Sequence, residues 1–391
     1  MGTYTLETLM DVIYDRCAGL DVHKKTVVAC VRHLEVGGAV RKETRTFGTM
    51  TADLLELADW LKQEGVRHAA MESTGVYWKP IWHILEDAFD LVLINARHIK
   101  QVPGRKTDVK DAEWIAQLLQ HGLLSPSFVP PEPIRELRDL TRQRAQLVAE
   151  KASVANRIHK TLEDANIKLS GVATDILGVS GRAMIAKLIQ GETDPNRLAD
   201  EARASLKKKV ILLRRALEGR VTDHHRFLLR MLTDQLRQLE DLIARYSERI
   251  EEAMRPFTQA EERLMTIPGV GRQAAEVIVA EIGADMSRFA TAGHLTSWAG
   301  LCPGNNKSAD KRKSGRTTKG SQWLRTTLVQ VAWAASHTKT TIFGATYQKW
   351  ARRLGKKKAL VAVARKVLEL AYTLLKLQID YQERLKPPQA A

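Results

Sequence analysis

The sequence has little cysteine, no apolar run of membrane-spanning length and no signal-like N-terminus. Its three cysteines, Cys17, Cys30 and Cys302, lie far apart, which excludes a disulfide framework and the spacing of a zinc site. The N-terminal stretch contains acids where a secretory signal carries positive charge. No apolar run approaches the roughly 20 residues that span a bilayer. We therefore expect a soluble protein of a reducing, cytoplasmic compartment with no membrane partner.

Acidic residues are also in short supply relative to basic ones. The 391 residues include 61 Lys and Arg against 45 Asp and Glu, which gives a net charge of +16. Such an excess favours a polyanionic partner, most often nucleic acid. A merely soluble basic protein is the alternative, but the basic residues cluster, which weakens it. Hydrophobic residues make up 44%, enough for real cores, and the length predicts two or three domains.

Residues 16–131 mix strand-like and helix-like segments. Segments rich in β-branched and small residues predict strands at 17–34, 40–48, 67–74 and 91–95. Helical spacing of apolar residues predicts helices at 51–64, 77–89 and 107–121. Strands come first and then alternate with helices, which predicts an α/β domain with a mixed sheet. The proline-rich segment 125–133 marks its end, because proline cannot continue a helix.

Residues 132–260 are predicted to be helical. A coiled-coil seam is indicated by apolar residues spaced 4, 3, 4, 3 and 4 apart: Leu232, Leu236, Leu239, Ile243, Tyr246 and Ile250. A looser apolar stripe runs from Ile134 to Leu162. Two such helices pair either with each other, as an antiparallel hairpin, or with a second protomer. Between them, residues 171–220 are expected to form short helices, interrupted at "GETDPN".

Residues 261–391 are predicted to be mostly α-helical, with helices at 322–336 and 359–377. The segment opens with "IPGVG" between two helices, which is typical of a helix-hairpin-helix. In that motif Gly269 and Gly271 let the backbone approach a phosphate, and the N–H groups of the next helix point at it. An ordinary helix–helix turn with glycine caps is the alternative.

Four carboxylates stand out in the first domain. Asp21 lies within the first strand, Glu72 ends a buried strand, and Asp108 and Asp111 lie three apart at a helix start. Several carboxylates together suit hard divalent cations in phosphoryl transfer. Taken singly, each also has a structural explanation: a turn acid, a helix N-terminal charge or a solvated neighbour. The bases nearby are expected to follow the phosphates of a substrate strand: Lys24, Arg105, Lys106 and Lys110.

The segment 300–320 has the composition of an anion-binding loop. It contains one acid, Asp310, against six bases: Lys307, Lys311, Arg312, Lys313, Arg316 and Lys319. Ser308 and Ser314 are candidate nucleophiles, although from composition alone a phosphate-binding serine is favoured over an attacking one. A serine nucleophile needs a base and a polarised phosphate. The loop supplies the cations but no histidine, so the base must come from elsewhere.

In order along the chain, "GLDVHK", "MESTGVYW", "RKTDVKDA", "IPGVG" and "AGLCPGNNKSADKRKSGRTTKG" resemble the DEDD transposases of the insertion-sequence-110 family, of the bridge-RNA-guided recombinase type. The resemblance spans about residues 17–377. It implies three parts: a RuvC-like, ribonuclease H-type domain (16–131), a coiled-coil linker (132–260), and a transposase domain with the serine loop (261–391). No role carries over to residues 171–220, because the middle region is long for the family.

The resemblance also implies roles for residues. The metal-binding tetrad falls on Asp21, Glu72, Asp108 and Asp111, with Mg²⁺ or Mn²⁺ as the cofactor. Counting from "GLCP", the catalytic serine falls on Ser308. Relatives often have Ser-Gly at this place, whereas this chain has Ser308-Ala309, so Ser314, which precedes Gly315, remains the competitor.

The implied reaction is site-specific DNA cleavage and strand exchange through a covalent phosphoserine link. The implied partners are donor and target DNA, a bridge RNA, and other protomers that form a dimer and then a tetramer. In a bacterial cell, such a protein is expected at the nucleoid when it acts. Two other readings stay open: a metal-only nuclease resembling a junction resolvase, and a non-catalytic nucleic-acid-binding scaffold.

Overall fold

The structure is a computed structural model, and it describes residues 11–73, 75–95, 111–303, 306–308, 311–314, 317–338 and 341–382. For 306–308 and 311–314 it describes the backbone alone. The chain divides into two compact units, residues 1–129 and 130–391. The predicted domain limits at 131/132 and 260/261 remain predictions.

The first unit is built on a five-stranded mixed sheet. Its strands are β1 (Arg16–Val22), β2 (Thr26–Leu34), β3 (Val40–Gly48), β4 (His68–Glu72) and β5 (Asp90–Ile94), in the order β3-β2-β1-β4-β5. The pairs β1–β2 and β2–β3 are antiparallel, whereas β1–β4 and β4–β5 are parallel. The expected α/β unit with a mixed sheet is confirmed.

The prediction of one strand over 17–34 is wrong. Two antiparallel strands occupy this range, joined by a tight turn in which the N–H of His23 donates to the carbonyl of Thr26 at 2.9 Å. The turn holds the polar run His23-Lys24-Lys25. This break is shorter than the apolar segments on either side, so the whole range has the composition of a strand.

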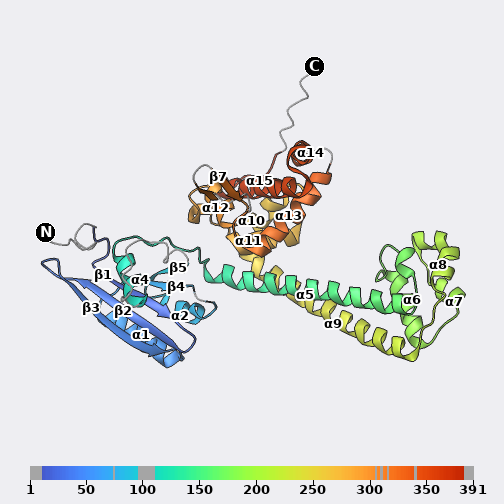
Figure 1. Cartoon of the computed structure of the whole chain (residues 1–391), viewed down its shortest axis with the longest axis horizontal. Helices are drawn as coiled ribbons and strands as arrows, with labels where there is room; N and C mark the ends of the chain where they lie inside the picture. The colour runs from blue at the N-terminus through green and yellow to red at the C-terminus, as the bar shows by residue number, and fades with distance from the viewer. Residues whose placement is uncertain are drawn as a thin grey trace, which may run out of the picture. The chain divides into compact units, whose positions relative to one another are not determined.

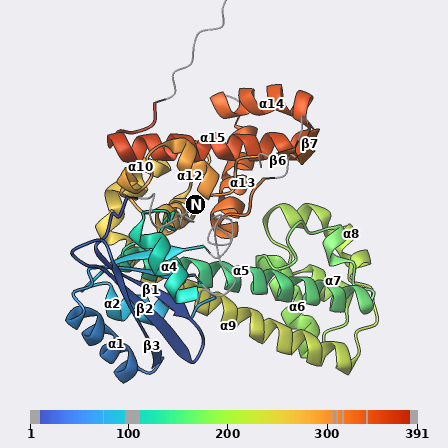
Figure 2. The same cartoon turned by 60° about the vertical axis from the view of Figure 1, so that its left-hand side comes forward.

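Helices cover both faces of this sheet (Figures 1 and 2). One face packs Ala18 and Leu20 of β1 with α1 (Thr51–Gln63) and α2 (Trp78–Leu85). The other face packs Cys17 with α4 (Asp111–Gln120). Alternate residues of a strand point to opposite faces. The odd-numbered residues of β1 therefore face α4.

Two long helices dominate the first half of the second unit. The helices α5 (Glu132–Asp164) and α9 (Asp223–Met254) lie side by side along much of their length, as Figure 1 shows. Val154 and Ile158 of α5 share a core with Leu236 and Leu239 of α9. This arrangement favours the antiparallel hairpin within one chain over pairing with a second protomer. A coiled-coil geometry for the pair remains a prediction.

A small helical cluster connects these two helices. It contains α6 (Val179–Gln190), α7 (Pro195–Ala199) and α8 (Val210–Ala216), with 3₁₀ turns at Leu169–Gly171 and Ala204–Lys209. The predicted interruption at "GETDPN" is present. There α6 ends at Gln190 with Gly191 as its C-cap, and Asp194 caps α7 by accepting from the N–H of Asn196 at 2.9 Å.

The rest of the second unit is a bundle of helices with one β-hairpin. The helices are α10 (Thr258–Met265), α11 (Arg272–Ile282), α12 (Ala292–Trp298), α13 (Gln322–His337), α14 (Ile342–Leu354) and α15 (Lys356–Leu377), with 3₁₀ turns at Arg255–Phe257 and Met286–Arg288. The helices predicted at 322–336 and 359–377 are confirmed. Among the described residues, none of the helices combines the length and apolarity needed to cross a bilayer.

Candidate functional site

Two of the predicted carboxylates lie at the same end of neighbouring strands. In the parallel pair of β1 and β4, Leu20 aligns with Met71, so Asp21 and Glu72 follow at the next position of each strand. Both continue the alternation that turns Cys17 of β1 and Ala70 of β4 toward α4. The two carboxylates therefore share one face and one edge of the sheet.

The third described carboxylate, Asp111, is brought to that edge by close helix packing. A Cβ on Gly19 would lie 2.3 Å from the carbonyl oxygen of Ala112 and 2.3 Å from the amide nitrogen of Ala116. Only a residue without a side chain allows α4 to approach β1 so closely. Asp111 begins α4 next to Ala112, and Gly19, which Ala112 contacts, lies two positions before Asp21 in β1.

These carboxylates do not form a closed metal site in the described part of the chain. Among the residues described, no three Asp, Glu, His or Cys side chains are grouped closely enough to hold an ion. The carboxylate of Asp21, 18% exposed, has the imidazole of His23 at 3.1 Å. Asp108, the fourth predicted ligand, lies outside the described residues, as do Arg105, Lys106 and Lys110.

The donor set fits a hard cation in its chemistry. Carboxylate oxygens from two strand ends and a helix start are the ligands that Mg²⁺ and Mn²⁺ take, and the three carboxylates come from elements that are packed together. The nearby predicted base Lys24 is exposed in the β1–β2 turn, where its carbonyl accepts from the Thr49 hydroxyl at 3.1 Å.

The serine-bearing segment is closed at its base by two glycines. Gly300 has φ +68, and a Cβ there would lie 2.7 Å from the nitrogen of Gly320. A Cβ on Gly320 would lie 2.3 Å from the carbonyl carbon of Ala299. Pro303 and Thr317 form an isolated antiparallel bridge just beyond this contact. The two ends of the segment therefore meet backbone to backbone.

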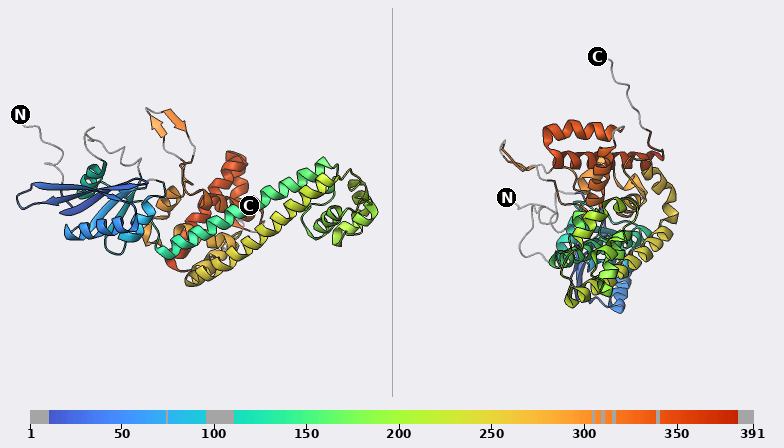
Figure 3. Two further views of the ribbon diagram at one scale, coloured as in Figure 1. Left: turned by 90° about the horizontal axis from the view of Figure 1, so that it is seen from below. Right: turned by 90° about the vertical axis from the view of Figure 1, so that its right-hand side faces the viewer.

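Beyond this base the chain forms a short antiparallel hairpin that Figure 3 shows apart from the helices. Its strands are β6 (Asn306–Ser308) and β7 (Lys311–Ser314). Ser308 aligns with Lys311, and Ser314 aligns with Asn306. Ser308 is therefore at the tip of the hairpin and Ser314 at its base. The predicted loop contains two strands, which the sequence did not indicate.

Most of the predicted bases of this segment belong to the two strands of the hairpin. Lys307, Lys311, Arg312 and Lys313 are strand residues whose backbone alone is described, and Arg316 lies outside the described residues. Lys319 is exposed next to Gly320. Their role in binding nucleic acid remains a prediction.

The two glycines of "IPGVG" have different surroundings. Gly269 has φ +87, and a Cβ there would lie 2.8 Å from the carbonyl oxygen of Val331 and 2.8 Å from the nitrogen of Ala335, both in α13. Gly271 precedes α11 and has no atom within 4 Å of its Cβ position. Helix packing thus explains Gly269, while Gly271 leaves room for a ligand. The helix-hairpin-helix remains a prediction.

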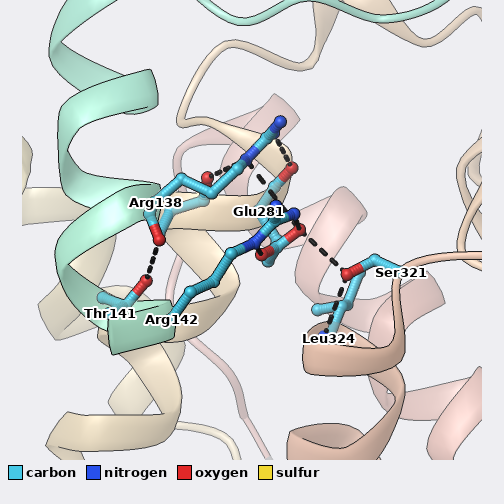
Figure 4. A network of polar contacts seen from close by, with 7 residues as sticks. Arg138, Thr141, Arg142, Glu281, Ser321 and Leu324 are labelled. Carbon is cyan, nitrogen blue, oxygen red and sulfur yellow. Dashed lines mark hydrogen bonds and ion pairs between the residues drawn. The ribbon is translucent and has the colours of Figure 1, made fainter. Parts of the chain in front are cut away.

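A buried polar network lies next to the serine segment, and the sequence analysis did not find it (Figure 4). The side chain of Glu281 in α11 is 1% exposed and accepts from Arg142 of α5 at 2.7 and 2.9 Å. Ser321 donates to the same carboxylate at 2.9 Å and caps α13 by accepting from the N–H of Leu324 at 3.3 Å. Glu281 thus joins α5 to the start of α13.

Further hydrogen bonds fix the position of α5 against α11. Arg138 donates to the carbonyls of Ala280 at 3.1 Å and of Glu281 at 2.7 Å. Burial lowers the pKa of the Arg138 guanidinium to about 10, although the charge of Glu281 acts in the opposite direction. A signal for this network was present: Glu276 and Glu281 interrupt the apolar stretch of α11, and charges in a buried helix need partners.

Two family models match the chain. One, described as "Transposase" with the DEDD signature of the IS110 group, covers residues 18–167. The other, described as "Transposase IS116/IS110/IS902 family", covers residues 261–348. The first includes Asp21, Glu72 and Asp111. The second includes "IPGVG" and the serine hairpin.

Similar proteins carry related descriptions. A "Probable family 20 transposase" of Pseudomonas aeruginosa is 26% identical over 338 residues, which are 84% of this chain and 89% of that protein. An uncharacterized 44.8 kDa protein of insertion element IS116 from Streptomyces clavuligerus is 28% identical, over 58% of this chain and 62% of its own. A "Pilin gene-inverting protein" of Moraxella bovis is 28% identical, over 39% and 49%.

Among solved structures, RuvC of Thermus thermophilus aligns with 29% of this chain and 99% of its own, at 13% identity and a TM-score of 0.23. The family assignment itself comes from the two family models, which cover both predicted halves of the site, and from the relative that matches most of the chain. This protein therefore belongs to the IS110 family of DNA transposases.

Proposed function

We propose that this transposase cuts and rejoins DNA through a serine nucleophile, Ser308, together with a divalent cation held by Asp21, Glu72, Asp108 and Asp111. The observation that carries the proposal is the common placement of the described carboxylates. Asp21 is next to the last residue of β1, and Glu72 is the last residue of the parallel strand β4. Both lie on the face of the sheet that packs against α4, which begins at Asp111. We further propose that this unit is RuvC-like, with a ribonuclease H-type fold.

The serine step follows from the chemistry of a phosphodiester. The hydroxyl oxygen of Ser308 forms a bond to phosphorus, its proton passes to a base outside the loop, and one bond from phosphorus to a deoxyribose oxygen breaks. The freed deoxyribose oxygen takes up a proton. The new phosphoserine ester keeps the number of ester bonds at phosphorus unchanged, so rejoining in the reverse direction needs no ATP.

Register favours Ser308 over Ser314 as the nucleophile. Ser308 is at the last register position of β6, farthest from the closed base, whereas Ser314 pairs with Asn306 near that base. The bases of the hairpin supply the positive charge that a reacting phosphate requires.

The four carboxylates would hold Mg²⁺ or Mn²⁺. Such an ion, when bound, polarises a phosphoryl oxygen and neutralises charge at phosphorus. The role of the protein is to present oxygen ligands from fixed elements, and the contact of Gly19 with α4 keeps Asp111 in place relative to β1.

The proposed partners are donor and target DNA, a bridge RNA that selects both, and further copies of this chain. The net charge of +16 supports binding to nucleic acid. With an RNA guide, base pairing reads sequence and the protein holds backbone and shape. A dimer that assembles into a tetramer would bring two DNAs together. The site of action would be the bacterial cytoplasm, at the nucleoid.

A denaturing gel for covalent protein–DNA adducts tests the nucleophile. Wild type, Ser308→Ala and Ser314→Ala are incubated with the DNA ends of the element, its RNA and Mg²⁺. We expect adducts with wild type and Ser314→Ala and none with Ser308→Ala. Adducts that persist in Ser308→Ala but disappear in Ser314→Ala would show that Ser314 is the nucleophile. Cleavage by all three proteins without any adduct would favour the metal-only nuclease.

A second experiment separates catalysis from binding. Asp21→Asn is compared with wild type for recombination in cells and for DNA binding in a gel shift. We expect recombination to be lost and binding to be retained. Unchanged recombination in Asp21→Asn would favour the non-catalytic scaffold instead.

A further inference from the structure

The helical cluster between α5 and α9 carries a basic surface that the transposase reaction does not explain. Residues 202–217, "ARASLKKKVILLRRAL", contain six bases and no acid. This segment forms the 3₁₀ turn Ala204–Lys209 and the helix α8. All six bases are exposed: Arg203, Lys207, Lys208, Lys209, Arg214 and Arg215. We call these six residues the basic surface.

The bases of the basic surface form no ion pair within 4.0 Å in the described part of the chain, although Arg203 interacts with Glu201 and Arg214 with Asp194 over longer distances. Other bases of the same cluster have close acidic partners: Lys168 has Glu163, Arg182 has Glu240, and Lys187 has Glu201, each at 2.6 Å. By contrast, no carboxylate among the described residues lies within 4.0 Å of any of the six. Six like charges within 13 residues repel one another, and a polyanion relieves that repulsion.

The basic surface has a fixed shape. Leu213 and Leu217 are buried in the core of the cluster, so one side of α8 is anchored and the other faces solvent. The N–H of Arg203 donates to the hydroxyl of Ser180 at 2.9 Å. The carbonyl of Ala216 accepts from the N–H of Lys168 at 2.8 Å. The fold therefore holds this segment in a defined conformation.

The chemistry favours nucleic acid over a lipid surface as the partner. Exposed Ile211 and Leu212 lie among the bases, as they would in a membrane-binding helix. However, α8 has only seven residues, and the segment has no aromatic residue to enter a lipid interface. Closely spaced lysines instead match the regular charge of a phosphodiester backbone, one per about 1.7 Å of duplex axis.

We propose that the basic surface binds the phosphate backbone of a nucleic acid at the end of the α5–α9 pair. This contact goes beyond the proposed serine and metal chemistry and does not depend on it. The 33 residues of α5 span about 50 Å at 1.5 Å per residue. The contact therefore lies about 50 Å from the start of α5, a distance equal to about 15 base pairs of duplex at 3.4 Å per step.

The salt dependence of binding tests this proposal. Binding of the full chain to a 40-base-pair DNA duplex and to an RNA hairpin is measured by fluorescence anisotropy over a range of KCl, with EDTA present so that no cleavage occurs. The variant is Lys207→Glu/Lys208→Glu/Lys209→Glu. The control is Arg230→Glu/Arg237→Glu/Arg245→Glu, which changes the net charge equally at exposed positions of α9. Thermal melting verifies that each variant is folded.

For at least one probe, we expect the slope of log Kd against log[KCl] to fall by about 2 to 3 in the variant, because each lost phosphate contact removes about 0.9. The control should keep the wild-type slope. An effect on the DNA or the RNA probe alone identifies which backbone is bound. If the triple Glu variant fails to fold, Lys207→Gln/Lys208→Gln/Lys209→Gln replaces it, with the same expected result.

An unchanged slope for both probes in the folded variant would overturn the proposal. If that variant also loses flotation on vesicles of phosphatidylserine and phosphatidylcholine, the surface binds lipid instead. These binding measurements do not require the serine chemistry. Failure of the proposed function is therefore distinguishable from failure of this proposal.

Discussion

Gly320 lies directly against Gly300, and neither position has room for a side chain. A Cβ on Gly320 would be 2.5 Å from the nitrogen of Gly300, and one on Gly300 would be 2.7 Å from the nitrogen of Gly320. This contact closes the base of the hairpin that carries Ser308. The hairpin therefore begins and ends at one point of the fold.

Gly320→Ala is expected to open this base. The added methyl group meets the backbone of Ala299 at 2.3 Å, which cannot yield as a flexible side chain would. We expect a loss of about 1–3 kcal/mol in the free energy of unfolding, measured by urea denaturation, and fewer serine adducts. Gly171→Ala, in the helical cluster, is the control, because no atom lies within 4 Å of its Cβ position. Equal behaviour of the two variants would contradict the closed base.

Glu281→Gln should destabilise the second unit. The substitution removes the negative charge that Arg142 contacts with two hydrogen bonds in a site where Glu281 is 1% exposed. We expect a loss of about 1–3 kcal/mol, because Glu281 is buried whereas Arg142 is 34% exposed and stays partly hydrated. Urea unfolding measures the loss, and Glu262→Gln, at an exposed position of α10, is the matched control. A loss below 1 kcal/mol would show that the network contributes little.

Glu240 is expected to make stability depend on acid pH. Hydrogen bonds from Arg182 and from Lys151 lower the pKa of its carboxyl from 4.5 to about 2, against the opposing effect of burial. Because the pKa is lower in the folded state, the stabilisation is present above pH 4.5 and disappears as the pH falls toward 2. Melting temperatures of wild type and Glu240→Gln should therefore converge over this range. A constant difference between the two melting temperatures down to pH 2 would contradict the lowered pKa of Glu240.

Gly19→Ala should move α4 away from the sheet. Its methyl group would meet the backbone of Ala112 and of Ala116 at 2.3 Å. We expect a lower melting temperature and at least a tenfold loss of Mg²⁺-dependent cleavage, because Asp111 moves relative to Asp21. Gly171→Ala is the control, with no atom within 4 Å of its Cβ position. Full cleavage by a folded Gly19→Ala protein would show that the metal site does not need Asp111 at this position.

The sequence predicted those parts of the molecule whose residues interact locally or with a regular period. The composition of the β-branched and small-residue segments predicted strands that carry Asp21 and Glu72, with Glu72 at a strand end but Asp21 inside a strand that was drawn too long. The apolar spacing in 232–250 located one of the paired helices. The hairpin of β6 and β7 was missed because its strands are polar and short. Their pairing rests on backbone hydrogen bonds and the closed base, which leave no apolar pattern.

The partners in long-range polar contacts could not be identified from the sequence either. Arg142 and Glu281 are 139 positions apart, and no local rule links them. The role of Gly269 also could not be read from its neighbours in the sequence. Its neighbours in sequence are typical of a phosphate-binding turn, yet its closest contacts are Val331 and Ala335 of α13. Only the packed structure separates a glycine needed for helix packing from one that faces a ligand.

The antiparallel course of α5 and α9 makes the cluster between them a separable module. The chain leaves α5 at Ala165 and returns at Arg220, whose N–H donates to the carbonyl of Ala165 at 2.8 Å. The two attachment points are thus adjacent, so another compact domain with neighbouring termini fits the same position. Exchange of this module would change what the end of the helix pair binds and leave the serine hairpin and the carboxylates intact.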